Sequence, residues 1–167
     1  MTAPTTEALP ELIRKTGAAN NRGNSKQDYE TPWEFIRAVE SRFGPVVWDL
    51  AATKENAKGL LWISEEIDSL ASKWSPGVLS WLNPPFGDIA PWAKKCAEEA
   101  ALGARILLLT PASVDSNWWR DYIHGKAWVE FLSPRISFDG KNSFPKPCTL
   151  SCFNVCGVGY GYWRWKP

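Results

Sequence analysis

The tetrapeptide Asn83-Pro84-Pro85-Phe86 is the part of the sequence whose residue types and spacing point most directly to chemistry. The amide oxygen of Asn83 and the carbonyl oxygen of Pro84 can each accept a hydrogen bond from an exocyclic amine such as adenine N6. Two acceptors favour a more tetrahedral nitrogen, whose lone pair then points at an electrophilic methyl group. The prolines have fixed φ angles and hold both acceptors before the substrate arrives, and the Phe86 ring offers a face for a planar base.

A proline turn that merely ends a strand is the plainer interpretation of these four residues. The residues around them favour a functional loop instead. An apolar run at 78–82 predicts a buried strand before the motif, and residues 89–102 predict a helix after it. Because paired prolines cannot continue inside a sheet, the motif must lie at the carboxyl end of that strand. A base inside a duplex would have to be flipped out of the stack to reach it.

The elements that position this loop follow from hydrophobic spacing. Phe35, Ile36, Val39 and Phe43 recur at helical spacing, which predicts a helix that begins at Pro32 and ends at Gly44. Short apolar runs predict strands at 45–50, 60–63, 78–82, 105–109, 128–138 and 149–155. Helical patterns predict further helices at 68–73, 89–102 and 117–126.

Strands that alternate with helices, in continuous apolar runs, indicate an α/β fold with a mainly parallel sheet. The last two strands have no helix between them, so they are expected to pair as an antiparallel hairpin at one edge. Open α/β sheets bind ligands at the carboxyl ends of their strands, where Asp49 and Asn83 both lie. Only about 33 residues separate these two, too few for two complete strand-helix units, which predicts an abbreviated sheet.

Length and composition indicate a single domain. The chain has 167 residues, of which 44% are apolar, enough for one core. We expect this domain at residues 28–167, preceded by a flexible, basic N-terminal arm at 1–27, most simply a solvated tail. The net charge of +1 means that any nucleic-acid binding must come from a local patch. With no long apolar window and no signal peptide, we expect a cytoplasmic protein that does not contact membranes.

The cysteines do not predict a metal site. Cys148, Cys152 and Cys156 lack the Cys-x-x-Cys spacing of zinc ligands, and the single histidine, His124, is distant in sequence. Buried free thiols are therefore the expected role of this group.

Several blocks occur in an order and spacing that resemble the phage-type DNA N6-adenine methyltransferases, which are small Dam-like enzymes. The resemblance covers roughly residues 28–156 and rests on the blocks Asp28-Tyr29-Glu30-Thr31-Pro32, Asp49-Leu50-Ala51-Ala52, Asn56-Ala57-Lys58, Asp68-Ser69-Leu70, Trp81-Leu82-Asn83-Pro84-Pro85-Phe86, Asp115-Ser116-Asn117-Trp118-Trp119 and Arg135-Ile136-Ser137-Phe138. It implies an abbreviated Rossmann-like class I methyltransferase fold. It also implies S-adenosylmethionine as the methyl donor, no metal, and site-specific methylation of adenine N6 in double-stranded DNA inside a bacterial host cell, by a phage- or prophage-encoded enzyme.

The resemblance also implies roles for individual residues. Asn83, Pro84, Pro85 and Phe86 are the expected catalytic loop. The expected donor-binding residues are Tyr29, Thr31, Pro32, Asp49, Ala51 and Asp68, and the expected substrate-binding residues are Phe86, Trp118, Trp119 and Arg135.

This chain departs from the usual family pattern at several positions. It has no glycine-rich loop after the first strand, and its tetrapeptide has Asn in place of the frequent Asp and Phe in place of Tyr. The abbreviated sheet leaves the carboxylate for the donor ribose open among Glu65, Glu66 and Asp68.

Each supporting residue also has a structural interpretation. Asp49 could cap a following helix, and Asp68 could be the N-cap of the segment that begins at Ser69. Trp118 and Trp119 are either core residues or a wall of the target-base pocket, and Arg135 contacts either phosphate or a surface carboxylate. The aromatic and basic segment at 160–166 suits nucleic-acid stacking, but an edge strand with one packed face is favoured.

Other functions share this chemistry. Methylation of guanine N2 in RNA or of a protein glutamine is the nearest enzymatic alternative, and a DNA-binding module without catalysis is another. No inserted segment is long enough for a large recognition domain. Recognition of a DNA site is therefore expected from short loops such as 139–147, from the two tails or from a second subunit in a homodimer.

Overall fold

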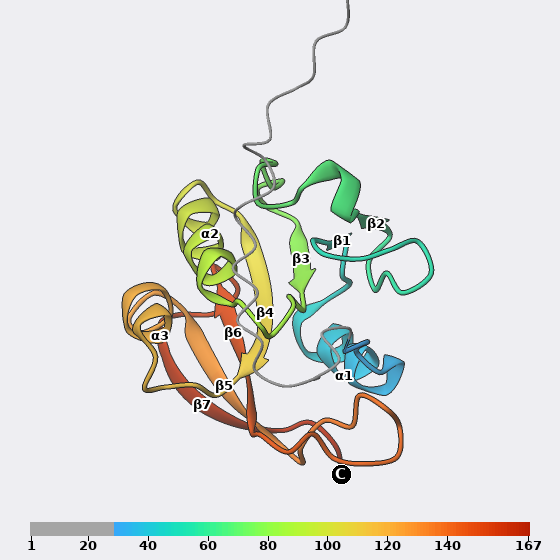
Figure 1. Cartoon of the computed structure of the whole chain (residues 1–167). Helices are drawn as coiled ribbons and strands as arrows, with labels where there is room; N and C mark the ends of the chain where they lie inside the picture. Colours follow the sequence, from blue (N-terminus) through green and yellow to red (C-terminus); the bar gives the residue numbers. More distant parts are fainter. Residues whose placement is uncertain (1–28) are drawn as a thin grey trace, which may run out of the picture.

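The computed structural model describes residues 29–167 and shows one seven-stranded sheet with helices on both faces (Figure 1). The predicted N-terminal arm lies outside the described residues. The helices are α1 (Trp33–Phe43), α2 (Ala90–Ala101), α3 (Asn117–Tyr122) and a 3₁₀ turn, η2 (Glu65–Ile67). The strands are β1 (Trp48–Asp49), β2 (Leu61–Trp62), β3 (Leu79–Leu82), β4 (Arg105–Pro111), β5 (Trp128–Ser133), β6 (Cys148–Phe153) and β7 (Gly159–Arg164).

The sheet has the strand order β2-β1-β3-β4-β6-β5-β7. Strands β2, β1, β3 and β4 pair in parallel, and β6 runs antiparallel to both β4 and β5. The predicted α/β class with a mainly parallel sheet and an antiparallel pair of late strands is thus confirmed. Strand β7 pairs in parallel along the whole of β5, so the antiparallel pair lies one strand inside the edge. The carboxyl ends of β1, β3, β4 and β5 all meet at one edge.

The part of the sheet around β1 and β2 is short, as the spacing of Asp49 and Asn83 predicts. Each of these strands has two residues. Between β2 and β3, the described structure contains one helical segment, the 3₁₀ turn η2. A helix predicted at 68–73 is absent, because Asp68 adopts a left-handed φ of 54° and ends η2. Its carboxylate accepts hydrogen bonds from the backbone N–H groups of Leu70 and Ala71, which shapes a turn there.

Two hydrophobic clusters hold the helices against the sheet. On one face, Phe35, Ile36 and Val39 of α1 pack against Leu107 and other residues of β3, β4 and β6. On the other face, α2 and α3 pack over Ile106, Leu108 and their neighbours. The C-terminal segment forms the edge strand that the sequence favours, with Trp163 and Trp165 buried. The predicted strand at 128–138 ends five residues early, at Ser133, where Pro134 brings no N–H for pairing.

The remaining structural observations concern the burial of the cysteines, membrane-spanning helices and metal-binding clusters. All four cysteines are free, and Cys96, Cys148 and Cys152 are buried, whereas Cys156 is exposed against expectation. Burial raises the pKa of the Cys148 thiol to about 12. Within residues 29–167, no helix has the length and apolar character that a membrane crossing requires. The same residues contain no cluster of three or more His, Cys, Asp or Glu side chains suited to a metal ion.

Candidate active site

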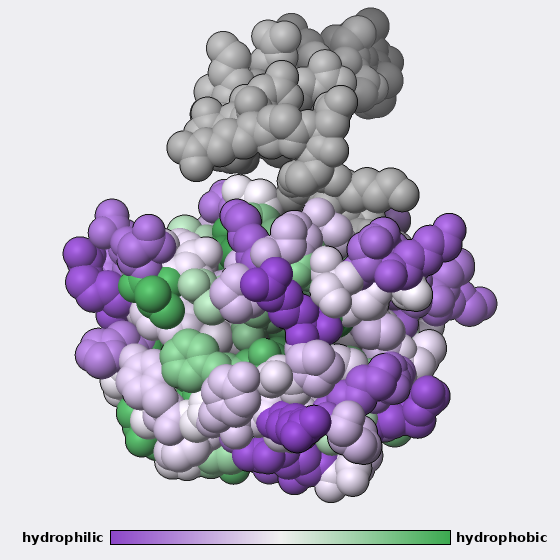
Figure 2. Space-filling view, turned by 90° about the horizontal axis from the view of Figure 1, so that it is seen from below, coloured by the Kyte–Doolittle hydropathy of each residue, from purple (hydrophilic) through white to green (hydrophobic). Residues whose placement is uncertain are grey.

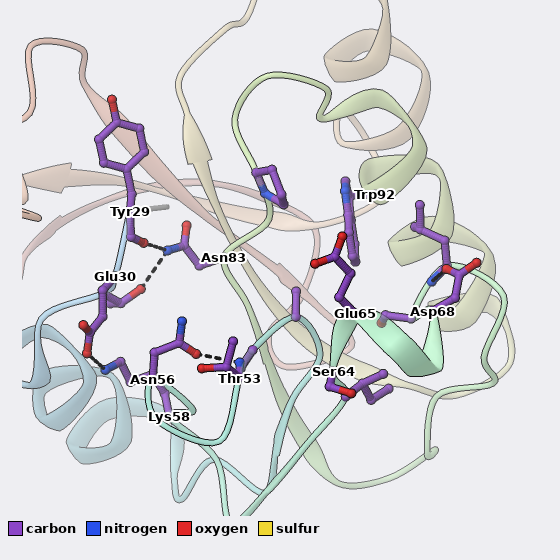
Figure 3. Close-up of a pocket in the computed structure, with 17 residues that line it drawn as sticks. Tyr29, Glu30, Thr53, Asn56, Lys58, Ser64, Glu65, Asp68, Asn83 and Trp92 are labelled. Carbon is purple, nitrogen blue, oxygen red and sulfur yellow. Dashed lines mark hydrogen bonds and ion pairs between the residues drawn. The ribbon is translucent and has the colours of Figure 1, made fainter. Parts of the chain in front are cut away.

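A cavity of about 550 Å³ lies at the edge where the carboxyl ends of β1, β2 and β3 meet. This volume is typical of a pocket for a small organic molecule or cofactor. Figure 3 shows the side chains that project into it from several loops. They come from the segment before α1, the loops that follow β1, β2 and β3, and α2: Tyr29, Glu30, Thr31, Ala51, Ala52, Thr53, Asn56, Lys58, Ile63, Ser64, Glu65, Asp68, Ser69, Leu70, Asn83, Pro85 and Trp92.

Asn83 has an amide that is fixed in one orientation. Its Nδ2 group donates hydrogen bonds to the backbone carbonyl of Tyr29 and, at 3.1 Å, to Oγ1 of Thr31 (Figure 3). A carbonyl oxygen can only accept, so the amide nitrogen must face Tyr29. Asn83 Oδ1 is therefore turned the other way, where it is buried and has no hydrogen-bond partner among the described residues. A buried acceptor without a partner is unfavourable unless a ligand supplies the donor.

Asp49 shapes the loop after β1 and does not line the cavity. Its two carboxylate oxygens accept hydrogen bonds from the backbone N–H groups of Ala51, at 3.3 Å, and Lys58, at 2.9 Å. Burial raises the pKa of Asp49, while these two N–H groups and the charge of Lys58 act in the opposite direction. The helix-cap interpretation of Asp49 is wrong, because the bonded N–H groups belong to this loop, which contains no helix.

Gly59 lets the same loop return close to β1. A Cβ atom at this position would lie 2.7 Å from the backbone nitrogen of Asp49 and 2.8 Å from the carbonyl oxygen of Val47. Any other residue here would displace backbone. Gly59 therefore allows close packing of this loop against the backbone of β1.

Lys58 and Glu30 form an ion pair at one end of the cavity, with Lys58 Nζ 2.7 Å from Glu30 Oε1 (Figure 3). The Lys58 side chain is only 3% exposed, and its Nζ also lies 4.6 Å from the centre of the Trp33 ring. Both charges line the cavity. Sequence reasoning did not select either residue as a site residue, although both fall within the matching blocks.

The acidic residues at the opposite end of the cavity differ in their position and in their hydrogen bonds. Glu65 and Asp68 line the cavity, and Glu66 does not. One oxygen of the Asp68 carboxylate, Oδ1, is used by its own turn, since it accepts from the N–H groups of Leu70 and Ala71. Glu65 is exposed and projects into the cavity beside Trp92 (Figure 3).

Four aromatic rings form a cluster next to the Asn83 loop, named here the aromatic cluster (Tyr29, Phe86, Phe138 and Phe144). The Phe86 ring lies 5.5 Å from Tyr29, 6.0 Å from Phe138 and 5.7 Å from Phe144, measured between ring centres. Phe86 therefore belongs to a packed group that joins three segments of the chain. It remains half-buried.

The other predicted site residues lie in varied surroundings. Tyr29, Thr31, Ala51 and Asp68 line the cavity, while Pro32 precedes α1 behind them. Trp119 is 3% exposed and packs in the core cluster under α3, and Trp118 packs partly against that cluster. Arg135 is exposed on the loop after β5 and donates a hydrogen bond to the Pro145 carbonyl. None of these last three lines the cavity.

Comparison with known proteins identifies the family to which the chain belongs. A DNA N-6-adenine-methyltransferase of Escherichia phage T1 is 30% identical over 129 residues, which are 75% of this chain and 54% of that protein. The chain thus matches about half the length of this relative. Residues 18–148 match the model of the family described as DNA N-6-adenine-methyltransferase (Dam). Because this match covers most of the chain, the chain belongs to the Dam family of DNA N6-adenine methyltransferases.

Proposed function

We propose that this protein transfers a methyl group from S-adenosylmethionine to N6 of adenine in double-stranded DNA. The observation that carries the proposal is the orientation of the Asn83 amide, whose buried oxygen lacks a partner among the described residues. An amino group of a base supplies the hydrogen that this oxygen can accept. Family membership supports the identity of the base.

The Asn83 amide acts as an acceptor that is in place before the substrate binds. Both Nδ2 hydrogen bonds, to Tyr29 and Thr31, hold the oxygen toward the incoming amine. The backbone carbonyl of Pro84 serves as the second acceptor for the same amino group. Preorganised acceptors of this kind stabilise the positive charge that develops on nitrogen during methyl transfer, without a strong base.

The cavity suits S-adenosylmethionine in charge as well as in size. When bound, this group supplies an electrophilic methyl carried on a sulfonium. Among the described residues, three carboxylates line the cavity, those of Glu30, Glu65 and Asp68, against one cation, Lys58. In this assignment Lys58 binds the carboxylate of the donor's methionine end and Glu30 binds its ammonium. Their existing ion pair shows that opposite charges already meet there.

Glu65 is the carboxylate that we assign to the ribose hydroxyls of the donor. Its side chain projects into the cavity, and neither of its oxygens has a hydrogen bond that competes with a ligand within the described structure. Oδ1 of Asp68 already accepts two backbone hydrogen bonds, so we assign this residue to the turn beside the donor. Glu66 does not reach the cavity.

A methylation assay with labelled donor tests this function directly. The protein is incubated with separate pools of DNA, RNA and protein, and the labelled nucleosides are then identified after digestion. We expect label in double-stranded DNA, as N6-methyladenine. Label confined to RNA or protein would refute the proposal. Expression in a methylation-deficient bacterium, followed by mapping of modified bases, then gives the recognised site.

A further inference from the structure

The loop between β5 and β6 (residues 134–147, named here the β5–β6 loop) begins at the same edge of the sheet as the Asn83 loop. It leaves the carboxyl end of β5, and β5 is parallel to β4 because both pair antiparallel with β6. In Figure 1 this orange loop extends at the foot of the molecule, close to α1. Its position makes it one of the loops that surround the entrance for a substrate.

Two aromatic rings of the β5–β6 loop pack against the Asn83 loop. Phe138 and Phe144 both belong to the aromatic cluster and lie 5.3 Å and 5.1 Å from the Tyr29 ring, in addition to their contacts with Phe86. Tyr29 in turn provides the carbonyl that orients the Asn83 amide. A charge on this loop therefore has a defined position relative to the acceptor oxygen.

The loop also has internal hydrogen bonds that fix its shape. Asp139 Oδ1 accepts from the backbone N–H groups of Lys141 and Asn142, each at 2.8 Å. These bonds hold the pKa of Asp139 far below its ordinary value, so the carboxylate stays ionised while its oxygens remain occupied. Arg135 closes the base of the loop through the Pro145 carbonyl.

The loop carries the local positive charge that nucleic-acid binding requires in a nearly neutral chain. Arg135, Lys141 and Lys146 are all exposed, and Asp139 is the one acid in the segment. Neither Lys141 nor Lys146 forms an ion pair with another residue of the described part. Figure 2 views the molecule from below and shows mainly hydrophilic side chains on this face, with small hydrophobic patches between them.

We propose that the β5–β6 loop holds the phosphate backbone of duplex DNA beside the target adenine, with Lys141 and Lys146 as the phosphate contacts. This inference rests on the proposed function and names the surface that binds its substrate. The loop positions DNA and does not read its sequence, because lysine contacts to phosphate carry no base information. The rigid link through the aromatic cluster sets the distance between the held phosphates and Asn83.

The experiment compares two double variants that remove the same charge. Lys141→Ala with Lys146→Ala removes both lysines of the loop. Lys73→Ala with Lys126→Ala removes two exposed lysines elsewhere, of which Lys126 lies just before the opposite end of β5. Affinity for a labelled duplex is measured over a range of salt concentrations, together with donor affinity and the KM for DNA.

We expect the loop variant to reduce the slope of log affinity against log salt by about two, since each phosphate contact contributes about 0.9. Its KM for DNA should rise while its donor affinity stays that of the wild type. The control variant should retain the wild-type slope. An unchanged slope in the loop variant, or an equal change in both variants, would overturn the inference.

Failure of this inference is separable from failure of the proposed function. If the wild-type protein methylates DNA and the loop variant binds DNA as tightly as the wild type, the role of the loop is rejected and the proposed function is retained. Wild-type protein that binds donor but leaves duplex DNA unmethylated would reject the proposed function and with it the role of the loop.

Discussion

The two halves of the sheet are built in different ways. The half around β1, β2 and β3, named here the donor half after the site proposed for S-adenosylmethionine, has strands of two to four residues, and individual polar contacts hold its loops. The half formed by β4, β6, β5 and β7, named here the scaffold half, has strands of six or seven residues. Its strands β4 and β6 are buried along almost their whole length.

This difference separates stability from ligand binding. In the scaffold half, apolar burial is distributed over many residues, so no single polar contact sets its geometry. In the donor half, a few side chains such as Asp49 and Asn83 determine where the cavity wall lies. Substitutions in the scaffold half should therefore lower the free energy of unfolding, and those in the donor half should lower donor affinity or the rate.

The largest effect on rate is expected for Asn83→Ala. Loss of one preorganised group of this kind costs about 10²- to 10³-fold in kcat. Donor affinity, measured by calorimetry, should remain largely unchanged, because the proposed partner of the missing oxygen is the substrate amine and not the donor. Turnover equal to that of the wild type would contradict the role of Asn83.

Asn83→Asp sharpens the same test. An ionised carboxylate would place an oxygen against the Tyr29 carbonyl, where the amide now donates. Protonation restores one donor at this position, so the rate of the variant relative to wild type should rise as the pH is lowered. A relative rate that is independent of pH would show that this contact does not matter.

The largest effect on stability is expected for Leu107→Ala in the scaffold half. Leu107 is fully buried in β4, and such truncations cost about 2–5 kcal/mol of unfolding free energy. Chemical denaturation measures this loss. Donor affinity at a temperature where the variant is folded should match that of the wild type. A large loss of donor affinity in the folded variant would break the separation of the two halves.

Glu65→Gln should weaken donor binding by about tenfold or more, since a hydrogen bond to a charged group contributes about 1.5–3 kcal/mol. Glu66→Gln is the matched control, because Glu66 is adjacent in sequence, is also exposed and does not line the cavity. Calorimetric titration with S-adenosylmethionine measures both. Equal losses in the two variants would remove Glu65 from the donor site.

The smallest effect is expected for Thr31→Val, which removes one of the two acceptors that hold the Asn83 amide. A single hydrogen bond contributes about 0.5–1.5 kcal/mol, so kcat should fall by roughly two- to tenfold. Thr31→Ser keeps the hydroxyl and should restore most of the rate. If serine and valine reduce kcat alike, then the hydroxyl does not position the amide.

The sequence predicts well those features that depend on backbone chemistry or on continuous apolar runs. The strand before Asn83 follows from an apolar run, and its end ahead of Pro84 follows from the inability of proline to pair. The structure confirms both, since β3 ends at Leu82. The abbreviated sheet follows from the short distance between Asp49 and Asn83. These signals are local, so no knowledge of distant contacts is needed.

Features that depend on tertiary contacts escape sequence reasoning. Trp119 is a core residue because α3 packs beside α2 in the cluster that covers this face of the sheet, and no local pattern distinguishes it from a pocket wall. Lys58 is buried in the cavity only because Glu30 and Trp33 meet it from another segment. The sequence marks Gly59 only as a lone glycine in the loop between β1 and β2, and its close approach to the backbone depends on the path of β1.

The acceptor that Tyr29 offers to Asn83 belongs to the main chain, and every amino acid carries it. Exchange of the side chain at this position can alter ring packing while it leaves the acceptor itself intact. A saturation library should therefore show broad tolerance at position 29 to residues that fill the same space, and narrow tolerance at position 31, where only Thr and Ser provide a small hydroxyl.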